Sequence, residues 1–179
     1  MKVDLSRYNN SWYNPGNAVK RVLWYYTNLI FFKSGWFPFY GLKVSLLKLY
    51  GAKVGNAVLI KPFVNIKYPW FLNIGNHVWI GEDVWIDNLT QVTIADNVCI
   101  SQGAMLLTGS HDYKSTSFNL EVKEITLHEG VWICAKAVIC AGVTCHTNSI
   151  VTAGTVITND CETNGIYKGN PAIHIKTRQ

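Results

Sequence analysis

Aliphatic residues recur at every sixth position from residue 54 onward, and this spacing constrains the fold more than any other feature of the sequence. They form five groups of three: Val54, Ile60 and Ile66; Ile74, Ile80 and Ile86; Ile94, Ile100 and Leu106; Leu127, Ile133 and Ile139; Cys145, Val151 and Ile157. Four residues after most of them stands a second small or β-branched residue, such as Val58 or Val64. A period of six fits neither an α-helix nor a regular strand. Two inward positions in every six residues indicate a short strand followed by a turn, and three such units close one triangular coil.

The interruptions of this period all fall at one place in the coil. The spacing widens to eight residues after Ile66 and after Ile86, and to twenty-one after Leu106. Each of these residues completes the third side of a coil, so every insertion lies on the same edge. We therefore predict an all-β fold, a parallel β-helix of about five triangular coils over residues 54–160 with one extended loop. A Val/Ile-rich β-sandwich is the alternative, but it does not explain the register.

Stacked coils should lie roughly 4.8 Å apart, as neighbouring strands do, so the aliphatic residues would form continuous interior columns. The spacing does not determine handedness. Crossovers between parallel strands are normally right-handed, so periodicity alone does not predict a left-handed coil.

Residues 1–53 precede the repeat and carry helical patterns. Asn17 is a suitable N-cap for a helix that reaches Phe32, and Gly51 ends a second helix that starts near Gly41. Both segments hold more aromatic residues than two short helices can hide between themselves. We predict that they cap the first coil, whose strand edges would otherwise be unpaired.

The same helices allow a second interpretation. Lys20, Arg21 and Lys33 would face lipid headgroups if the helices lay on a membrane surface, as a weak peripheral contact. The apolar run Val22–Phe32 is too short to span a bilayer. At the other end of the chain, residues 161–179 are expected to leave the coil as a C-terminal tail.

Composition narrows the class of protein. Hydrophobic residues make up 49% of the chain and charged residues 15%, which indicates an ordered domain. The formal net charge of +5 is too small for the basic stripe of a nucleic-acid-binding protein. Five cysteines without a CxxC pair, and an N-terminus without a signal-peptide pattern, are typical of a protein in the reducing cytoplasm.

The long insertion over residues 109–124 is where we expect chemistry, because loops on a rigid scaffold concentrate function. It contains His111, followed by Asp112. An imidazole acts as a general base at neutral pH when it is held within hydrogen-bonding reach of a hydroxyl. On chemistry alone, a merely solvated histidine remains the alternative. His128 and His146 should stack on the outer surface, but no third ligand follows in register, so we predict no metal site.

Several segments together resemble a known family. The hexad pattern is joined by LLTGSHDY around His111, by VWICAKAVICAGVTCHTNSIVTAGTVIT and by the closing GNPA. These segments are similar to the hexapeptide-repeat acyltransferases, and with YNNSWYNPG they most resemble the colanic acid acetyltransferase type. The resemblance implies a left-handed coil and a homotrimer with active sites between neighbouring subunits. It also implies acetyl-CoA as the acyl donor, and His111 as the base that deprotonates a sugar hydroxyl.

The resemblance further implies site residues, position by position. Six would line the groove for acetyl-CoA: Trp132, Ala135, Ala153, Thr158, Lys176 and Arg178. Gly81 stands where galactoside-type relatives have an acceptor-binding Asn, so the acceptor must be held differently here. Asp87, Asn88 and Asp112 are the candidates for that role.

We therefore expect an O-acetyltransferase that moves an acetyl group from acetyl-CoA to a sugar hydroxyl, in exopolysaccharide assembly of the colanic acid kind. Two alternatives stay open. The chain could acylate the nitrogen of an amino-sugar nucleotide, or it could be a β-helix without activity that serves assembly or regulation. A β-helix without activity would tolerate loss of His111.

Overall fold

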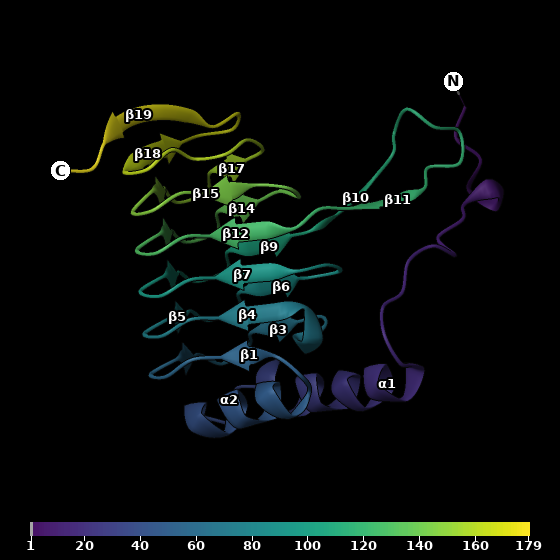
Figure 1. The fold of residues 1–179 in the computed structure, drawn as a ribbon, viewed down its shortest axis with the longest axis horizontal. Helices are drawn as coiled ribbons and strands as arrows, with labels where there is room; N and C mark the ends of the chain where they lie inside the picture. The colour runs from purple at the N-terminus through teal and green to yellow at the C-terminus, as the bar shows by residue number, and fades with distance from the viewer. Residues whose placement is uncertain (1) are drawn as a thin grey trace.

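Residues 2–179 are described by a computed structural model, in which the repeat forms a parallel β-helix above a helical base (Figure 1). Three sheets form its sides, with five complete coils and a partial sixth. Sheet A contains β1 (Lys53–Val54), β4 (Leu72–Ile74), β7 (Val92–Ile94), β12 (Ile125–Leu127) and β15 (Thr144–Cys145). Sheet B contains β2 (Leu59–Ile60), β5 (Trp79–Ile80), β8 (Cys99–Ile100), β13 (Trp132–Ile133), β16 (Ile150–Val151), β18 (Gly165–Lys168) and β19 (Ile173–Thr177). Sheet C contains β3 (Asn65–Ile66), β6 (Trp85–Asp87), β9 (Met105–Leu107), β14 (Val138–Ile139) and β17 (Val156–Ile157).

The coil is left-handed. Followed upward in Figure 1, the chain crosses the front of the molecule from right to left in β4, turns to the rear, and returns rightward in β6 before it enters β7 one level higher. This winding is opposite to the usual hand of parallel crossovers. The fold that the resemblance implied is therefore confirmed.

The hexad positions form the interior columns that the sequence predicts. Ile74 pairs with Ile94, Ile94 with Leu127, and Leu127 with Cys145, and all four side chains are buried. The corners depend on residues in the left-handed backbone conformation. They include His77 between sheets A and B, with φ of 56°, and Gly130 at the equivalent position of the fourth coil.

One corner of the coil differs from the other two, as the spacing predicts. Between sheets C and A the chain inserts a 3-10 turn, η3 (Pro69–Phe71), in the first coil, and a long β-hairpin in the third. Figure 1 shows these insertions above one another on the same side of the molecule. The side chains that line the candidate site project from this corner.

The N-terminal helices close the base of the coil. They are α1 (Ala18–Thr27), the π-helical η2 (Asn28–Phe32) and α2 (Tyr40–Leu49), and Asn17 caps α1 by accepting from the N–H groups of Val19 and Lys20. Trp24 Nε1 donates to the carbonyl oxygen of Ile66 at 2.8 Å, and the buried Lys43 Nζ donates to the carbonyl oxygen of Lys61 at 3.0 Å. Burial lowers the pKa of the Lys43 ammonium. The cap thus supplies donors to first-coil carbonyls that have no coil beneath them.

The winding continues further than the sequence predicts. Cys161 pairs with Cys145 in an isolated parallel bridge, and β18 continues sheet B beside β16. The last strand, β19, folds back antiparallel on β18 and covers the end of sheet B. Within residues 2–179, no helix has the length and apolar character needed to cross a membrane.

Candidate active site

The hairpin between β9 and β12 is held at both of its ends. β10 (Gly109–His111) pairs antiparallel with β11 (Leu120–Val122), and the loop between them meets the N-terminal arm of the chain, residues 2–16. The backbone N–H of Asp4 donates to Thr116 O at 2.9 Å, and that of Asn9 to Asn119 Oδ1 at 3.0 Å. Figure 1 shows the arm, which includes the 3-10 turn η1 (Leu5–Arg7), rising from α1 to the hairpin tip. The long loop is therefore ordered by a segment about a hundred residues earlier.

His111 is the last residue of β10, and its ring is held in one orientation. Its Nδ1 is 2.9 Å from the carbonyl oxygen of Phe118. Because a carbonyl oxygen only accepts hydrogen bonds, Nδ1 must carry the proton. In the neutral ring Nε2 then has the free lone pair, which is the state that a general base requires.

Phe118 holds the imidazole in two ways. Its phenyl ring stacks on the ring of His111, with centroids 4.4 Å apart and planes 5° from parallel. Its backbone has φ of 49°, a left-handed conformation that is uncommon for a residue with a bulky side chain. This conformation lets one residue present both its ring and its carbonyl oxygen to the same histidine.

His111 lines a hollow of about 650 Å³ that we call the histidine pocket. Its wall comes from the N-terminal arm, from α1, from β6, and from the hairpin. The polar residues around it are Tyr8, Asn10, Ser11, Tyr13, Arg21, Lys67, Tyr68, Asp87 and Ser110. The ring of Tyr8 lies 6.0 Å from that of His111, so the arm forms part of the pocket next to the imidazole.

Charged and phenolic groups face one another in the histidine pocket. Lys67 Nζ lies 3.0 Å from Asp87 Oδ1, and the Tyr13 hydroxyl donates to Leu89 O at 2.7 Å. Burial, with the nearby Tyr68 and Asp87, raises the pKa of Tyr13 above its usual range, so this hydroxyl stays protonated, keeps its bond to Leu89 O and can accept through its oxygen. A sugar, which carries several hydroxyls, finds both donors and acceptors here.

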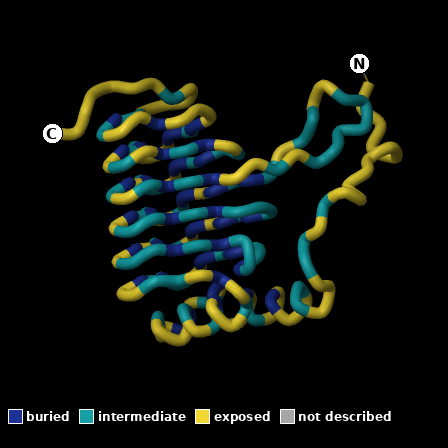
Figure 2. Tube along the Cα trace, in the orientation of Figure 1, coloured by how far each residue is buried: buried dark blue, intermediate teal, exposed yellow. Residues whose placement is uncertain are grey.

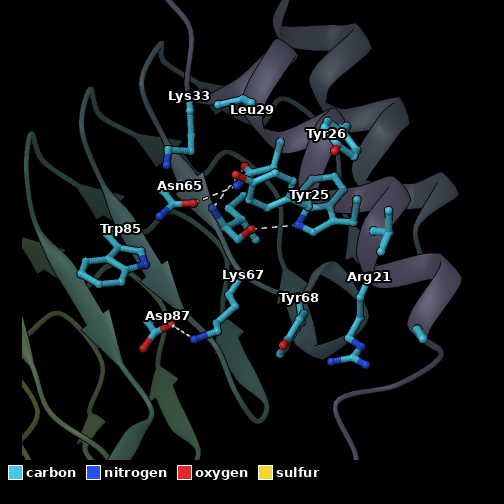
Figure 3. A pocket seen from close by; sticks show the side chains of 15 residues that line it. Arg21, Tyr25, Tyr26, Leu29, Lys33, Asn65, Lys67, Tyr68, Trp85 and Asp87 are labelled. Carbon is cyan, nitrogen blue, oxygen red and sulfur yellow. Dashed lines mark hydrogen bonds and ion pairs between the residues drawn. The ribbon is translucent and has the colours of Figure 1, made fainter.

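A second hollow of about 590 Å³ continues the first one toward the base, and we call it the helix pocket. It lies between α1 and sheet C and is lined largely by apolar and aromatic groups, including Val22, Tyr25 and Leu29. Four residues line both pockets: Arg21, Lys67, Tyr68 and Asp87. In Figure 3 Arg21, Tyr68 and Lys67 lie along one edge of the helix pocket, and Lys67 points to Asp87. Arg21 Nε is buried and has no hydrogen-bond partner within residues 2–179.

The three acceptor candidates from the sequence lie in different surroundings. Asp87 lines both pockets. Asn88 is fully buried, and its amide accepts from Tyr68 N at 3.0 Å and donates to Tyr68 O at 2.6 Å. Asp112 accepts from Lys114 N at 3.0 Å within the hairpin turn. The side chain of Asn88 is thus already engaged by the backbone of Tyr68, and that of Asp112 by the hairpin turn. The sequence suggested that both would contact the acceptor, but neither lines the histidine pocket.

The six candidates for the acyl-donor groove are spread around the coil. Thr158 lies at the root of the hairpin, in a hollow of about 290 Å³ that also contains Ser110 and Lys123. Ala135 and Ala153 occupy stacked turns between sheets B and C, where Gly154 N donates to Ala135 O at 3.0 Å. The other three candidates lie on or next to sheet B, and all are exposed. Trp132 belongs to β13, Lys176 belongs to β19, and Arg178 follows β19.

The triangular cross-section separates the candidates on sheet B from His111 within one chain. The hairpin leaves the corner between sheets C and A, and that corner lies opposite sheet B, with the core between them. Trp132, on sheet B, therefore cannot reach the imidazole of its own chain. Gly81 is also remote from the histidine pocket, and a Cβ there would come within 2.8 Å of Gln102 N, so the position requires glycine.

No cluster of three or more His, Cys, Asp or Glu side chains in residues 2–179 could hold a metal ion. His128 and His146 stack as expected, with ring centroids 5.2 Å apart and planes 8° from parallel. All five cysteines are free.

Sequence reasoning missed four residues of the pocket, Tyr8 and Tyr13 from the arm, Arg21 from α1 and Lys67 just after β3, and also Phe118, which holds His111. None of them belongs to the hexad pattern, and those of the arm lie about a hundred residues from His111. The only signal was the segment YNNSWYNPG, which resembled the family without indicating a role.

The coil, the single long loop at its third corner and the oriented histidine together define a hexapeptide-repeat acyltransferase. No family model matches the chain. The inferred colanic acid biosynthesis acetyltransferase WcaF of Escherichia coli (strain K12) is 36% identical over 168 residues, which cover 93% of this chain and 91% of that protein. The chain therefore belongs to the hexapeptide-repeat acetyltransferase family, and the resemblance seen in its sequence is confirmed.

Two solved structures extend the comparison. A hexapeptide-repeat acetyltransferase of Vibrio cholerae O1 biovar eltor, complexed with acetyl coenzyme A, superimposes with a TM-score of 0.82 at 23% identity, covering 93% of this chain and 92% of that one. This likeness supports the fold. A galactoside acetyltransferase in complex with coenzyme A superimposes with a TM-score of 0.79 at 28% identity, covering 90% and 82%.

Proposed function

We propose that this chain transfers an acetyl group from acetyl-CoA to a hydroxyl of a saccharide, with His111 as the general base. The observation that carries the proposal is the hydrogen bond from His111 Nδ1 to Phe118 O, which makes Nε2 the nitrogen that can accept a proton when the ring is neutral, in a residue that lines the histidine pocket. The family relationship supplies the reaction class. The coenzyme in the related galactoside acetyltransferase supports acetyl-CoA as the donor.

In this mechanism His111 Nε2 takes the proton of the acceptor hydroxyl as its oxygen attacks the thioester carbonyl carbon. The imidazolium remains bonded to Phe118 O through Nδ1. It then returns the proton to the thiolate of CoA, which leaves as the tetrahedral species collapses. Backbone N–H groups are the natural donors for the oxyanion. Neutral His111 is restored, and no covalent enzyme intermediate is needed.

The histidine pocket is the proposed acceptor site. Asp87 can accept hydrogen bonds from sugar hydroxyls, and Lys67 and Arg21 can donate to sugar oxygens. Of the three sequence candidates, Asp87 is the one that we retain. The pocket wall from the N-terminal arm would close over the saccharide and exclude water from the reacting atoms.

We propose that the chain works as a homotrimer with each active site between two subunits. The groove residues of sheet B cannot serve the His111 of their own chain, because the core lies between them. A neighbouring subunit would supply Trp132, Ala135, Ala153, Lys176 and Arg178, while Thr158 lies at the hairpin root of either chain. Each site would then combine the hairpin corner of one subunit with sheet B of its neighbour.

We also propose exopolysaccharide assembly in the cytoplasm as the setting, on the similarity to WcaF. Acylation of an amino-sugar nucleotide is the main competing reaction. An acceptor panel of hydroxyl sugars and matched amino sugars separates the two reactions. Transfer to amino sugars alone would contradict the O-acetyltransferase proposal.

The decisive experiment replaces His111 with Ala and measures the release of CoA thiol with the acceptor panel. Loss of a general base should lower kcat by roughly a hundredfold to ten-thousandfold. Tyr113→Ala is the matched control, because this residue is exposed on the same hairpin outside the histidine pocket, and it should retain wild-type turnover. Near-wild-type turnover of His111→Ala would instead favour a β-helix without a catalytic histidine.

A further inference from the structure

The helical segment formed by α1 and η2 has two apolar faces, and the hydrophobic core uses only one of them. Trp24 and Phe32 turn inward and join the hydrophobic core. On the opposite side Val19, Val22, Leu23, Tyr26 and Ile30 follow the spacing of one helical face. These five side chains are between 44% and 66% exposed. A surface helix normally carries polar groups at such positions.

The exposed apolar surface continues beyond α1 over the rest of the base. Trp36, Phe39, Leu42 and Leu49 are all exposed, at or beyond the end of η2 and on α2. Figure 2 shows exposed segments along the side of both helices that is turned away from the coils. We call this surface, from Val19 to Leu49, the base patch.

The positive charge of the chain is concentrated in its N-terminal part, which contains the base patch. Residues 5–81 contain nine Lys and Arg and no Asp or Glu, whereas residues 82–179 contain six Lys and Arg and ten Asp and Glu. Two ion pairs occur in the described chain, and they engage Lys61 and Lys67. Lys33, just after η2, and Lys48, on α2, are exposed and have no acidic partner in residues 2–179.

We propose that the base patch docks on the surface of an anionic phospholipid bilayer. Apolar and aromatic side chains flanked by lysines are the combination that places a helix at the boundary between headgroups and acyl chains. The absence of acidic residues over 77 consecutive positions removes the repulsion that such a surface would otherwise meet. Two copies of the patch facing each other would bring like charges together, so the charge favours lipid over self-association through this face.

This inference does not depend on the acetyl-transfer proposal, but it bears on the acceptor. The helix pocket lies along the neighbouring face of α1, shares Val22 and Tyr26 with the base patch, and joins the histidine pocket through Arg21 and Lys67. A chain docked through α1 would hold both pockets close to the membrane surface.

The test is flotation of the full chain with vesicles of phosphatidylcholine alone and of phosphatidylcholine with about 30% phosphatidylglycerol. The wild-type chain should bind the anionic vesicles at least about tenfold more strongly, and added salt should weaken binding by screening the lysines. Lack of binding to anionic vesicles at low salt would overturn the proposal.

Matched double variants locate the contact. Leu23→Glu with Ile30→Glu changes two residues of the base patch that are 55% and 44% exposed. Ile173→Glu with Ile175→Glu changes two residues at the opposite end of the coil that are 62% and 44% exposed. We expect the first pair to weaken vesicle binding at least about tenfold and the second to leave it within about twofold.

Two further measurements keep the outcome unambiguous. Circular dichroism confirms that both double variants fold. Light scattering reports their mass, and a smaller assembly for the Leu23→Glu, Ile30→Glu variant would assign the base patch to a contact between copies and contradict lipid docking. Acetyl transfer to a free sugar should be unchanged in this variant, so a failure of docking is distinct from a failure of the proposed reaction.

Discussion

At the scale of single residues, the orientation of His111 depends on its contacts with Phe118. Its left-handed backbone turns the carbonyl oxygen to His111 Nδ1 while its ring covers the imidazole. Neither contact requires a charged partner, and Asp112, the acidic neighbour in sequence, is engaged by the backbone of Lys114. The orientation of the proposed general base thus depends on both the backbone and the ring of Phe118.

This predicts a measurable role for the phenyl ring. Phe118→Ala keeps the carbonyl acceptor but removes the stacked ring, so the imidazole gains freedom to rotate. We expect kcat to fall by about tenfold to a hundredfold, because small misplacements of a catalytic group have large effects on rate. The KM for acetyl-CoA should change little. Steady-state kinetics measure both quantities.

Tyr113→Ala, on the same hairpin, again serves as the control. A fall in kcat/KM that came entirely from KM would show that Phe118 affects binding and not the position of His111.

At the scale of elements, the helical base is bound to the coil through specific polar contacts as well as apolar packing. Trp24 donates to Ile66 O, Asn28 Nδ2 donates to Asn65 Oδ1 at 2.8 Å, and Lys43 donates to first-coil carbonyls. The first coil has no strands below it, so these donors replace the ladder that the next coil would provide.

We therefore predict that Trp24→Phe lowers the free energy of unfolding by about 1–3 kcal/mol, because the buried carbonyl of Ile66 loses its donor. Urea denaturation measures the change. Trp12→Phe is the matched control, since Trp12 is 58% exposed and should give a change within about 0.5 kcal/mol. Equal stability of the two variants would mean that water replaces the indole of Trp24 as the donor to Ile66 O.

At the scale of the whole molecule, the triangular section separates the two halves of the proposed site. His111 projects from the corner between sheets C and A, and Trp132 lies on the opposite side. A single chain therefore presents the proposed acceptor pocket at one side and the proposed donor groove on another. The proposed homotrimer would join them.

Complementation between inactive chains tests this arrangement. His111→Ala and Trp132→Ala chains should each have low activity. After mixing and reassembly, about one quarter of the sites in a trimer would combine an intact His111 with an intact Trp132 from the neighbouring subunit. Acetyl-transfer assays should recover a corresponding part of the wild-type rate. No recovery, with exchange of subunits confirmed by mass, would contradict a shared site.

The repeat of six carried most of the information about the fold. Interior position, coil count and the edge that bears the insertions all follow from local spacing, because each coil buries the same two positions and stacks on its neighbours. His111 could be selected for the same reason, as the histidine of the one long insertion.

Only the tertiary structure decided what surrounds that histidine. Asp87 and Asn88 are adjacent in sequence, yet one lines the pocket and the other is buried against the backbone of Tyr68. The arm that brings Tyr8 next to the imidazole is about a hundred residues away along the chain. Contacts of this kind are set by how irregular segments fold over a finished coil, and no period in the sequence encodes them. Repetition therefore specifies the scaffold, whereas the site is built from the residues that break the repeat.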